Sequence, residues 1–456
     1  MTATPRGARF AGVVPQAWMA VVVAALGYFV DIYDLVLFAV VRRDSLTAIG
    51  GTGPAATADG FWGTLQLELD IALGRTTGSL EQAGAALFAA QMTGLLLGGF
   101  LWGILGDRRG RLTVLFGSIL LYSVANLGNA FVGSVPAYAL MRLLAGVGLA
   151  GELGAGITLV SEHLPTRLRG YGTMIVATVG LAGAVAAGLT GQWFGQHVSR
   201  LMGGALGPWQ VAYLMGGGMG LALLALRVGV AESGLYKTSA LARQPLRRGA
   251  VWMLFWPPKR GLRYVCILLM GVPIWFVGGI LFVFAPEIGE SMGLVGAAGP
   301  KAGLAVIYGY AGAVVGDCLS GLLSQWMKSR LKVVSLFMVG IALGVACTLS
   351  LGSRGANAYY LCIFLTGLAT GYWALFVTVA AESFGTNLRA TAATTAPNLV
   401  RGSAVLITMA WETLQHAGQT AQEAAGWVGA VCLILGLTAV GFIPETFSTS
   451  LDYQEH

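Results

Sequence analysis

Two carboxylates lie close together in the first long apolar run of the chain. Asp31 and Asp34 are three residues apart within residues 17–41, a spacing that places both side chains on one face of a helix. Two carboxylates in a low-dielectric environment do not both ionise readily, so one would hold a proton near neutral pH. We therefore predict a proton-binding site here, with the intervening Tyr33 as a candidate contact for a bound solute. The alternative is that both acids lie near the outer water and are simply solvated.

The fourth apolar run contains two further ionisable residues, Arg142 and Glu152, in a glycine-rich background. Charged side chains inside a membrane are costly, and they usually face a cavity or an opposite charge. We predict that Arg142 helps to bind a solute and that Glu152 is a proton site. A structural ion pair between parts of the helix bundle is the alternative.

The second half of the chain has fewer such residues. Asp317 lies in the eighth apolar run and is predicted to bind a proton, whereas Arg401 in the eleventh is predicted to bind a solute together with Asn398. Asp317 and Arg401 are expected to pair across neighbouring helices, and Pro397 is expected to break its helix and free a carbonyl group.

Aromatic residues in a helix bundle mostly serve packing. Trp275 and Trp373 lie within apolar runs, and we consider them candidates for a cavity wall.

Other chemistries leave no trace in the sequence. There is no phosphate-binding Gly-x-x-x-x-Gly-Lys sequence, no Ser-His-Asp set and no metal-ligand cluster,. The five cysteines all fall inside apolar runs without paired spacing, which indicates packing residues,. We expect no enzymatic activity, no cofactor and no metal. Movement of a solute would therefore be driven by an ion gradient or by the gradient of the solute itself.

The elements that position these residues are long apolar helices. The chain of 456 residues is 56% hydrophobic and only 10% charged, against about 25% charged residues in a soluble protein. A helix needs about 20 residues to cross the hydrocarbon core. Twelve runs of about this size occur, near 17–41, 82–104, 112–132, 136–160, 170–192, 208–231, 263–286, 303–324, 333–351, 358–380, 392–414 and 425–444. We predict an all-α membrane protein whose first run is a membrane span and not a cleaved signal peptide.

Lysine and arginine residues set the expected orientation. With the N-terminus inside, nineteen of the 27 fall in inner segments and six in outer ones, so both termini are predicted to be cytoplasmic. The basic surplus is thus a topology signal and requires no nucleic-acid partner. A basic, proline-containing stretch separates two sets of six spans, and we expect halves at 1–231 and 263–456 joined by a cytoplasmic linker at 232–262. The outer segment 44–81 is unusually long, and residues 61–72 within it are expected to form a short amphipathic helix.

The two halves also resemble each other. Glu, Thr, Leu and Arg coincide in segments 161–170 and 381–390 at an offset of 220, and a weaker match joins 103–106 with 321–324. Repeated halves are common in transporters, with the solute site at their interface. The repeated charges lie at cytoplasmic helix ends, where they are expected to pair within each segment as gating or structural charges; they are Glu162, Arg169, Glu382 and Arg389.

The most specific motif is Gly-Gly-Phe-Leu-Trp-Gly-Ile-Leu-Gly-Asp-Arg-Arg-Gly-Arg at residues 98–111. It resembles the signature loop between the second and third helices of the major facilitator superfamily. The acid pattern of the first run and the arginine of the fourth are similar to those of its metabolite:proton and phosphate:proton symporter branches. The resemblance implies two six-helix halves around a central cavity that opens alternately to each side. It also implies gating roles for Asp107, Arg108 and Arg111, whose charge contacts would break and re-form.

Together, these observations lead us to expect proton-coupled symport of a small polar metabolite, with an organic anion such as a carboxylate favoured. Because acids outnumber arginines within the predicted spans, a zwitterionic or cationic solute is also compatible with the sequence. One alternative is a proton-coupled antiporter that exports amphiphiles or drugs, and another is a transporter-like sensor without flux. The expected partners are the solute, protons and the lipid bilayer of a bacterial inner membrane, and we expect a monomer.

Overall fold

The computed structural model describes residues 15–50, 52–54, 56–57, 60–109, 111–152, 166–232, 251–296, 299–385 and 388–447. These residues form helices joined by short loops, and no strand occurs among them. An apolar chain in lipid must satisfy its backbone hydrogen bonds within itself, which a helix does. Within this part of the chain, nine helices are long and apolar enough to cross a membrane.

The first half of the chain forms a run of long helices with two short ones at one end of the bundle. They are α1 (Pro15–Ile49), α2 (Gly60–Ala72), α3 (Leu80–Arg109), α4 (Arg111–Asn129), α5 (Val135–Leu149), α7 (Thr166–Leu189), η1 (Thr190–Phe194), α8 (Gly195–Leu201) and α9 (Pro208–Glu232). The short helix expected at residues 61–72 is confirmed as α2.

The second half repeats this pattern. It comprises η3 (Val251–Leu254), α10 (Pro258–Phe276), η4 (Val277–Phe282), α11 (Ala285–Ser291), α12 (Ala302–Met327), α13 (Arg330–Leu351), η6 (Gly352–Arg354), α14 (Ala356–Thr370), α15 (Trp373–Glu382), α16 (Arg389–His416) and α17 (Ala421–Val440). Here η1 and η4 are π-helical continuations of the spans that precede them.

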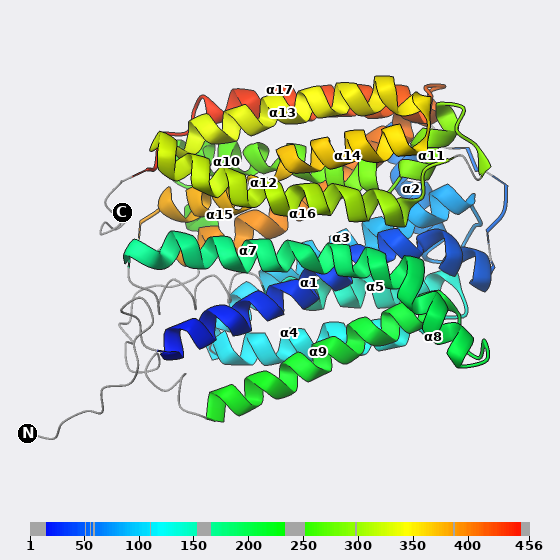
Figure 1. Cartoon of the computed structure of the whole chain (residues 1–456), viewed down its shortest axis with the longest axis horizontal. Helices are drawn as coiled ribbons and strands as arrows, with labels where there is room; N and C mark the ends of the chain where they lie inside the picture. The colour runs from blue at the N-terminus through cyan, green and yellow to red at the C-terminus, as the bar shows by residue number, and fades with distance from the viewer. Residues whose placement is uncertain are drawn as a thin grey trace, which may run out of the picture.

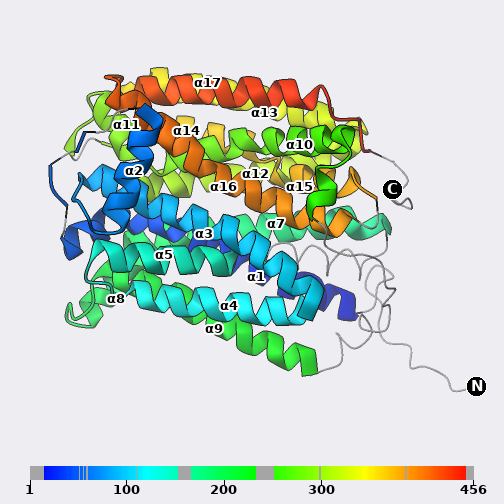
Figure 2. The same cartoon turned by 180° about the vertical axis from the view of Figure 1, so that it is seen from behind.

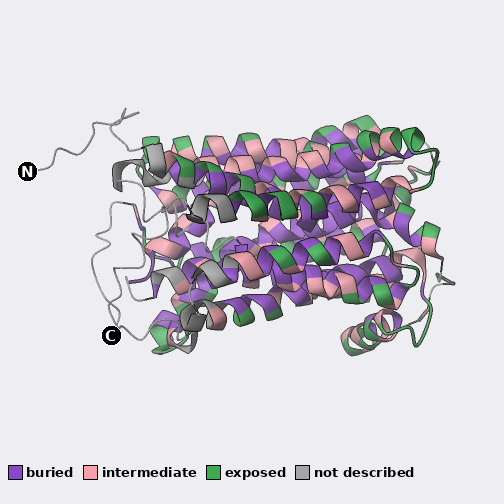
Figure 3. Ribbon diagram, turned by 90° about the horizontal axis from the view of Figure 1, so that it is seen from below, coloured by how far each residue is buried: buried purple, intermediate pink, exposed green. Residues whose placement is uncertain are grey.

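The helices lie side by side in two groups. Figures 1 and 2 show α1, α3, α4, α5, α7 and α9 on one side and α10 to α17 on the other. The described chain begins at Pro15 and α17 ends at Val440 at the same end of the bundle, as an even number of crossings requires (Figure 1). Buried residues gather between the helices, while exposed ones lie on the outside (Figure 3). Large apolar side chains such as Leu343 are exposed there and would face lipid.

The internal repeat has a packing basis. Helices α3 and α5 approach so closely that a Cβ atom on Gly146 would overlap the carbonyl oxygen of Gln91. In the second half, a Cβ on Gly367 in α14 would overlap the carbonyl oxygen of Gly309 in α12. Small residues permit such contacts between membrane helices. The two halves therefore use equivalent glycine contacts at equivalent helix pairs.

One local expectation is wrong. Helix α16 runs without interruption from Arg389 to His416 and contains Pro397 within it. Proline removes only one backbone donor, and contacts with α3 and α10 on either side hold the helix together.

Candidate substrate cavity

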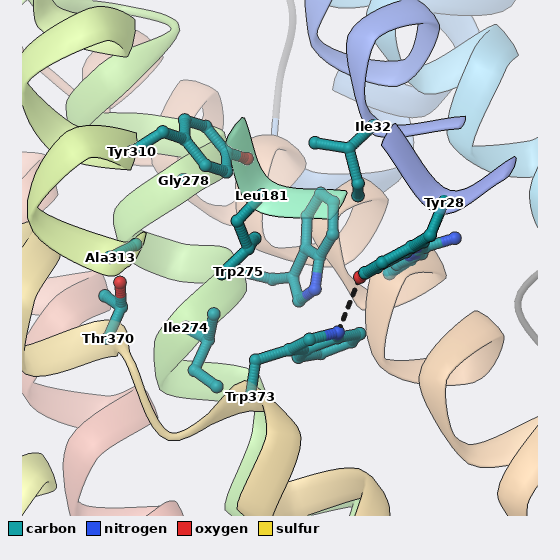
Figure 4. A pocket seen from close by; sticks show the side chains of 11 residues that line it. Tyr28, Ile32, Leu181, Ile274, Trp275, Gly278, Tyr310, Ala313, Thr370 and Trp373 are labelled. Carbon is teal, nitrogen blue, oxygen red and sulfur yellow. Dashed lines mark hydrogen bonds between the residues drawn. The ribbon is translucent and has the colours of Figure 1, made fainter. Parts of the chain in front are cut away.

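A cavity of about 40 Å³ lies where the two groups of helices meet. It is smaller than the usual small-molecule site, so binding of a solute requires the two groups to move apart. Its wall is mostly apolar and aromatic and contains one charged side chain (Figure 4). The lining residues are Tyr28, Ile32, Leu181, Ile274, Trp275, Gly278, Tyr310, Ala313, Thr370, Trp373 and Arg401.

The charged residue is Arg401 of α16, which is completely buried. Its Nη1 and Nη2 atoms each lie 3.4 Å from Oδ2 of Asp31 on α1, so the ion pair joins the two halves of the molecule. Nη2 is also 3.4 Å from the Tyr28 hydroxyl. These contacts are long, and Oδ1 of Asp31 and Nε of Arg401 have no partner in the described part of the chain. The guanidinium group therefore has unused capacity for another acceptor.

Aromatic rings surround this cation. The Arg401 guanidinium lies 5.8 Å from the centroid of Trp373 and 5.9 Å from that of Tyr28, distances typical of cation–π contacts. The Trp373 Nε1–H donates to the Tyr28 hydroxyl at 2.7 Å (Figure 4). Trp275 meets Trp373 edge to face, with ring centroids 6.4 Å apart. The site thus combines one cation with flat apolar walls.

Three of the six residues predicted to bind a solute line this cavity, namely Arg401, Trp275 and Trp373. The other three are engaged elsewhere. Tyr33 donates to the carbonyl oxygen of Ala212 at 3.1 Å, and the Asn398 side chain donates to the carbonyl oxygen of Ala150 at 2.9 Å.

Arg142, the remaining candidate, belongs to a separate buried group within the first half. It donates to the side chain of Gln91 and lies 4.8 Å from the centroid of Phe38. Asp34 lies near Asp31, Asn126 and this same arginine. Asp31 and Asp34 are both fully buried, so neither is merely solvated at the outer surface.

The other two predicted proton sites have local partners. Arg227 donates from Nη1 to Glu152 at 2.9 Å, and only 3% of this arginine is exposed. Asp317 accepts from the backbone N–H of Ala374 at 2.9 Å. The expected pair of Asp317 with Arg401 is wrong, because Asp317 accepts from the backbone of α15 and Arg401 pairs with Asp31 of α1.

A charged cluster at the end of the bundle opposite Pro15 was missed in the sequence. Nη2 of Arg42 on α1 lies 2.6 Å from Oε1 of Glu287 on α11, and Arg43 contacts Glu287 at 3.1 Å and Glu290 at 3.0 Å. Arg42 and Glu287 are buried, at 1% and 6% exposure. The only available signal in the sequence was a pair of acids after the seventh apolar run. This cluster joins the two halves near the C-terminal end of α1.

The predicted gating charges are only partly described. Glu382 accepts from Thr446 at 2.8 Å and from Arg330 at 3.5 Å, partners that the repeat did not indicate. Glu162 lies outside the described residues, and the side chains of the remaining five, Asp107, Arg108, Arg111, Arg169 and Arg389, are not described.

A bundle of membrane-spanning helices with a charged cavity between its halves defines the class of membrane transporters. The sequence profile of the Major Facilitator Superfamily matches residues 55–409, and the chain belongs to this superfamily. The expected all-α fold of twelve spans in two halves is thereby confirmed.

Known relatives agree with this assignment. The chain is 28% identical over 343 residues to the 3-(3-hydroxy-phenyl)propionate transporter of Escherichia coli, covering 72% of this chain and 78% of that protein. It is 34% identical over 115 residues to the niacin transporter NiaP of Acinetobacter baylyi, covering 24% of this chain and 26% of that protein. Its fold is similar to that of the proton:xylose symporter XylE, with a TM-score of 0.66 at 16% identity over 95% of this chain and 97% of that one.

Proposed function

We propose that this transporter carries an aromatic monocarboxylate together with a proton. The observation that carries the proposal is the buried Arg401, a single cation in a cavity walled by Tyr28, Trp275 and Trp373. A guanidinium group binds a carboxylate through paired N–H donors, and flat aromatic walls suit a flat ring. The relatives named above carry 3-(3-hydroxy-phenyl)propionate and niacin, both of which are aromatic carboxylates.

The pair of Asp31 and Arg401 supplies a mechanism for coupling. A solute carboxylate that binds Arg401 enters a buried site where Asp31 already provides one negative charge at 3.4 Å. Two anions beside one buried cation are unfavourable, and a proton on Asp31 removes the conflict. Proton and anion therefore favour each other's binding, which is the requirement for symport.

Alternating access would follow from relative motion of the two halves, residues 1–231 and 263–456, around the linker 232–262. The outer cluster of Arg42 and Glu287 must break for the cavity to open outward. The distribution of lysine and arginine supports cytoplasmic termini,, and we place the protein in a bacterial inner membrane.

Binding to the purified protein provides the first test. We expect isothermal titration calorimetry to detect benzoate and 4-hydroxybenzoate but not benzamide, which has the same ring and no negative charge. Arg401→Gln should weaken anion binding at least 100-fold, since a charged hydrogen-bonding pair is lost. Arg354→Gln, a change of an exposed arginine, is the matched control and should leave binding unchanged.

Transport is tested by counterflow of labelled 4-hydroxybenzoate in proteoliposomes. Flux into protein-free vesicles must be subtracted, because the neutral form of an aromatic acid crosses bilayers without a carrier. Counterflow lost in Arg401→Gln but kept in Arg354→Gln supports the proposal. Tight binding of benzamide or of amphiphilic cations would contradict it in favour of export, and binding without counterflow would favour a sensor.

A further inference from the structure

Besides Nε of Arg401, a second hydrogen-bond donor in the cavity wall has no acceptor among the described residues. Trp275 lines the cavity and is 8% exposed, yet its indole Nε1–H has no partner among the described residues. The indole of Trp373 in the same wall is paired with Tyr28. Buried polar groups are nearly always hydrogen-bonded, so an orphan donor in a binding cavity indicates an acceptor that arrives with the ligand.

The local backbone fixes this indole in place. Trp275 lies two residues after Pro273 and two residues before the π-helical segment η4. Segments of π-helix frequently occur at functional sites. The Trp275 ring is held edge to face against Trp373 (Figure 4), so packing sets its orientation without any hydrogen bond.

Space for a ligand lies on the same wall. A Cβ atom on Gly278 would meet only the hydroxyl of Tyr310, at 3.7 Å. The hydroxyls of Tyr310 and Thr370 also line the cavity, but a hydroxyl both donates and accepts and discriminates poorly between ligands. An indole N–H can only donate.

We propose that Trp275 selects substrates, by donating a hydrogen bond to an acceptor atom on the ring of a carboxylate held at Arg401. The inference rests on the proposed function and narrows it. The preferred solute carries a ring hydroxyl or a ring nitrogen in addition to its carboxylate. A site built around a hydrogen-bonding group rejects an analogue that lacks the partner, because the buried donor then stays unpaired.

Isosteric ligands test this on the unmodified protein. We expect 3- or 4-hydroxybenzoate to bind at least tenfold more tightly than the corresponding methylbenzoate, which has a similar shape and no ring acceptor. Nicotinate should likewise exceed benzoate. Equal affinities within each pair would overturn the inference while leaving the proposed function intact, whereas failure of every acid to bind would overturn both.

The variant Trp275→Phe tests the residue itself. It keeps an aromatic ring and removes the donor, so we expect the ratio of hydroxybenzoate affinity to methylbenzoate affinity to fall at least tenfold, which removes the preference for ring acceptors. Trp427→Phe, a change of an exposed tryptophan on α17, is the matched control and should retain the preference. Equal weakening of all ligands in Trp275→Phe, or an unchanged preference, would show that Trp275 serves packing only.

Discussion

At the scale of single residues, the four predicted proton sites differ in what surrounds them. Asp31 alone among them contacts the cation of the cavity. Asp34 lies beside Asn126 and Arg142, and Asp317 accepts from the Ala374 backbone. A carboxylate that shares its cation with the solute is the one whose protonation must respond to solute binding. Asp31 is therefore the residue at which coupling should be lost first.

We predict that Asp31→Asn makes anion binding independent of pH. In the unmodified protein, anion binding takes up a proton, so the affinity for 4-hydroxybenzoate should rise as pH falls, by up to about tenfold per pH unit. Calorimetry at pH 5.5, 6.5 and 7.5 measures this slope for both proteins. If the pH dependence persisted in Asp31→Asn, another acid would be the proton-binding site, and Asp34 would be the next candidate.

We predict that substitutions of the two buried arginines, Arg142 and Arg401, have different effects on the dissociation constant of the anion in the same assay. Arg142 does not line the cavity and donates to Gln91, so Arg142→Gln should leave the dissociation constant within about threefold. Arg401→Gln should abolish measurable binding. Thermal unfolding of each variant controls for misfolding, since loss of a buried charge partner is destabilising. Equal loss of affinity in the two variants would show that Arg142 also contributes to binding of the solute.

At the scale of helices, the outer ends of α1 and α11 are joined by Arg42 and Glu287. Removing one partner of a buried ion pair destabilises the state that contains the pair by about 3–5 kcal/mol. Here the destabilised state is the outward-closed arrangement. We therefore predict that Glu287→Gln shifts the population toward outward opening. The measurement is labelling by a membrane-impermeant maleimide of a cysteine at Ile32, in a background without the five native cysteines.

The neighbouring acid supplies the matched control for this experiment. Glu290 is 51% exposed in its pair with Arg43, and exposed ion pairs contribute little. Glu290→Gln should accelerate labelling by less than about threefold, against at least tenfold for Glu287→Gln. Similar rates in the two variants would show that the buried pair does not hold the outer side closed.

Helix α2 rests against the second half through buried side chains. The Thr64 hydroxyl lies 3.2 Å from that of Thr413 on α16, and Glu68 hydrogen-bonds to Glu412. Burial raises the pKa of Glu68 to about 7, although the hydrogen bond with Glu412 opposes part of this rise. Glu81 and Arg42 are the other charges near Glu412. Two carboxyl groups in such contact require a proton between them.

We predict that α2 detaches from α16 as pH rises. Because the docked helix keeps a proton that the free helix loses, docking is strongest below the ordinary carboxyl range and weakens up to pH of about 7. Spin labels at Leu69 and Trp427, again without native cysteines, should report a longer distance at pH 8 than at pH 5. Glu68→Gln keeps a hydrogen-bonding group without a charge and should remove this change. A pH-dependent distance in Glu68→Gln would contradict the assignment.

The sequence predicts helices better than it predicts their contacts. Apolar runs of about 20 residues and the repeat between segments 161–170 and 381–390 are local signals, and they predicted the spans and the equivalence of the halves. Ion pairs depend on which helices are neighbours, and Asp31 and Arg401 are separated by 370 residues. The same limit explains why Asp317 was paired with the wrong arginine and why the burial of Arg42 and Arg227 was missed.

At the scale of the whole molecule, the buried ion pairs lie at different positions along the length of the bundle. Arg42 and Glu287 join the halves at the outer end, and Asp31 and Arg401 join them at the cavity. The pair of Glu152 and Arg227 lies within the first half. Of these three pairs, the first two join the halves and must change when the halves move relative to each other. Of these, only the cavity pair can also respond to a solute.

The charge balance of the cavity predicts electroneutral transport. The empty site holds Arg401 and ionised Asp31, and the loaded site adds one anion and one proton, so its net charge does not change. We expect counterflow-competent proteoliposomes to accumulate 4-hydroxybenzoate when a pH gradient is imposed, and to be unaffected by a potassium diffusion potential set with valinomycin. Uptake driven by the potential would require a second proton, with Asp34 and Asp317 as the acids available to carry it. In that case, Asp34→Asn or Asp317→Asn should restore insensitivity to the potential, whereas Asp31→Asn should abolish the response to the pH gradient.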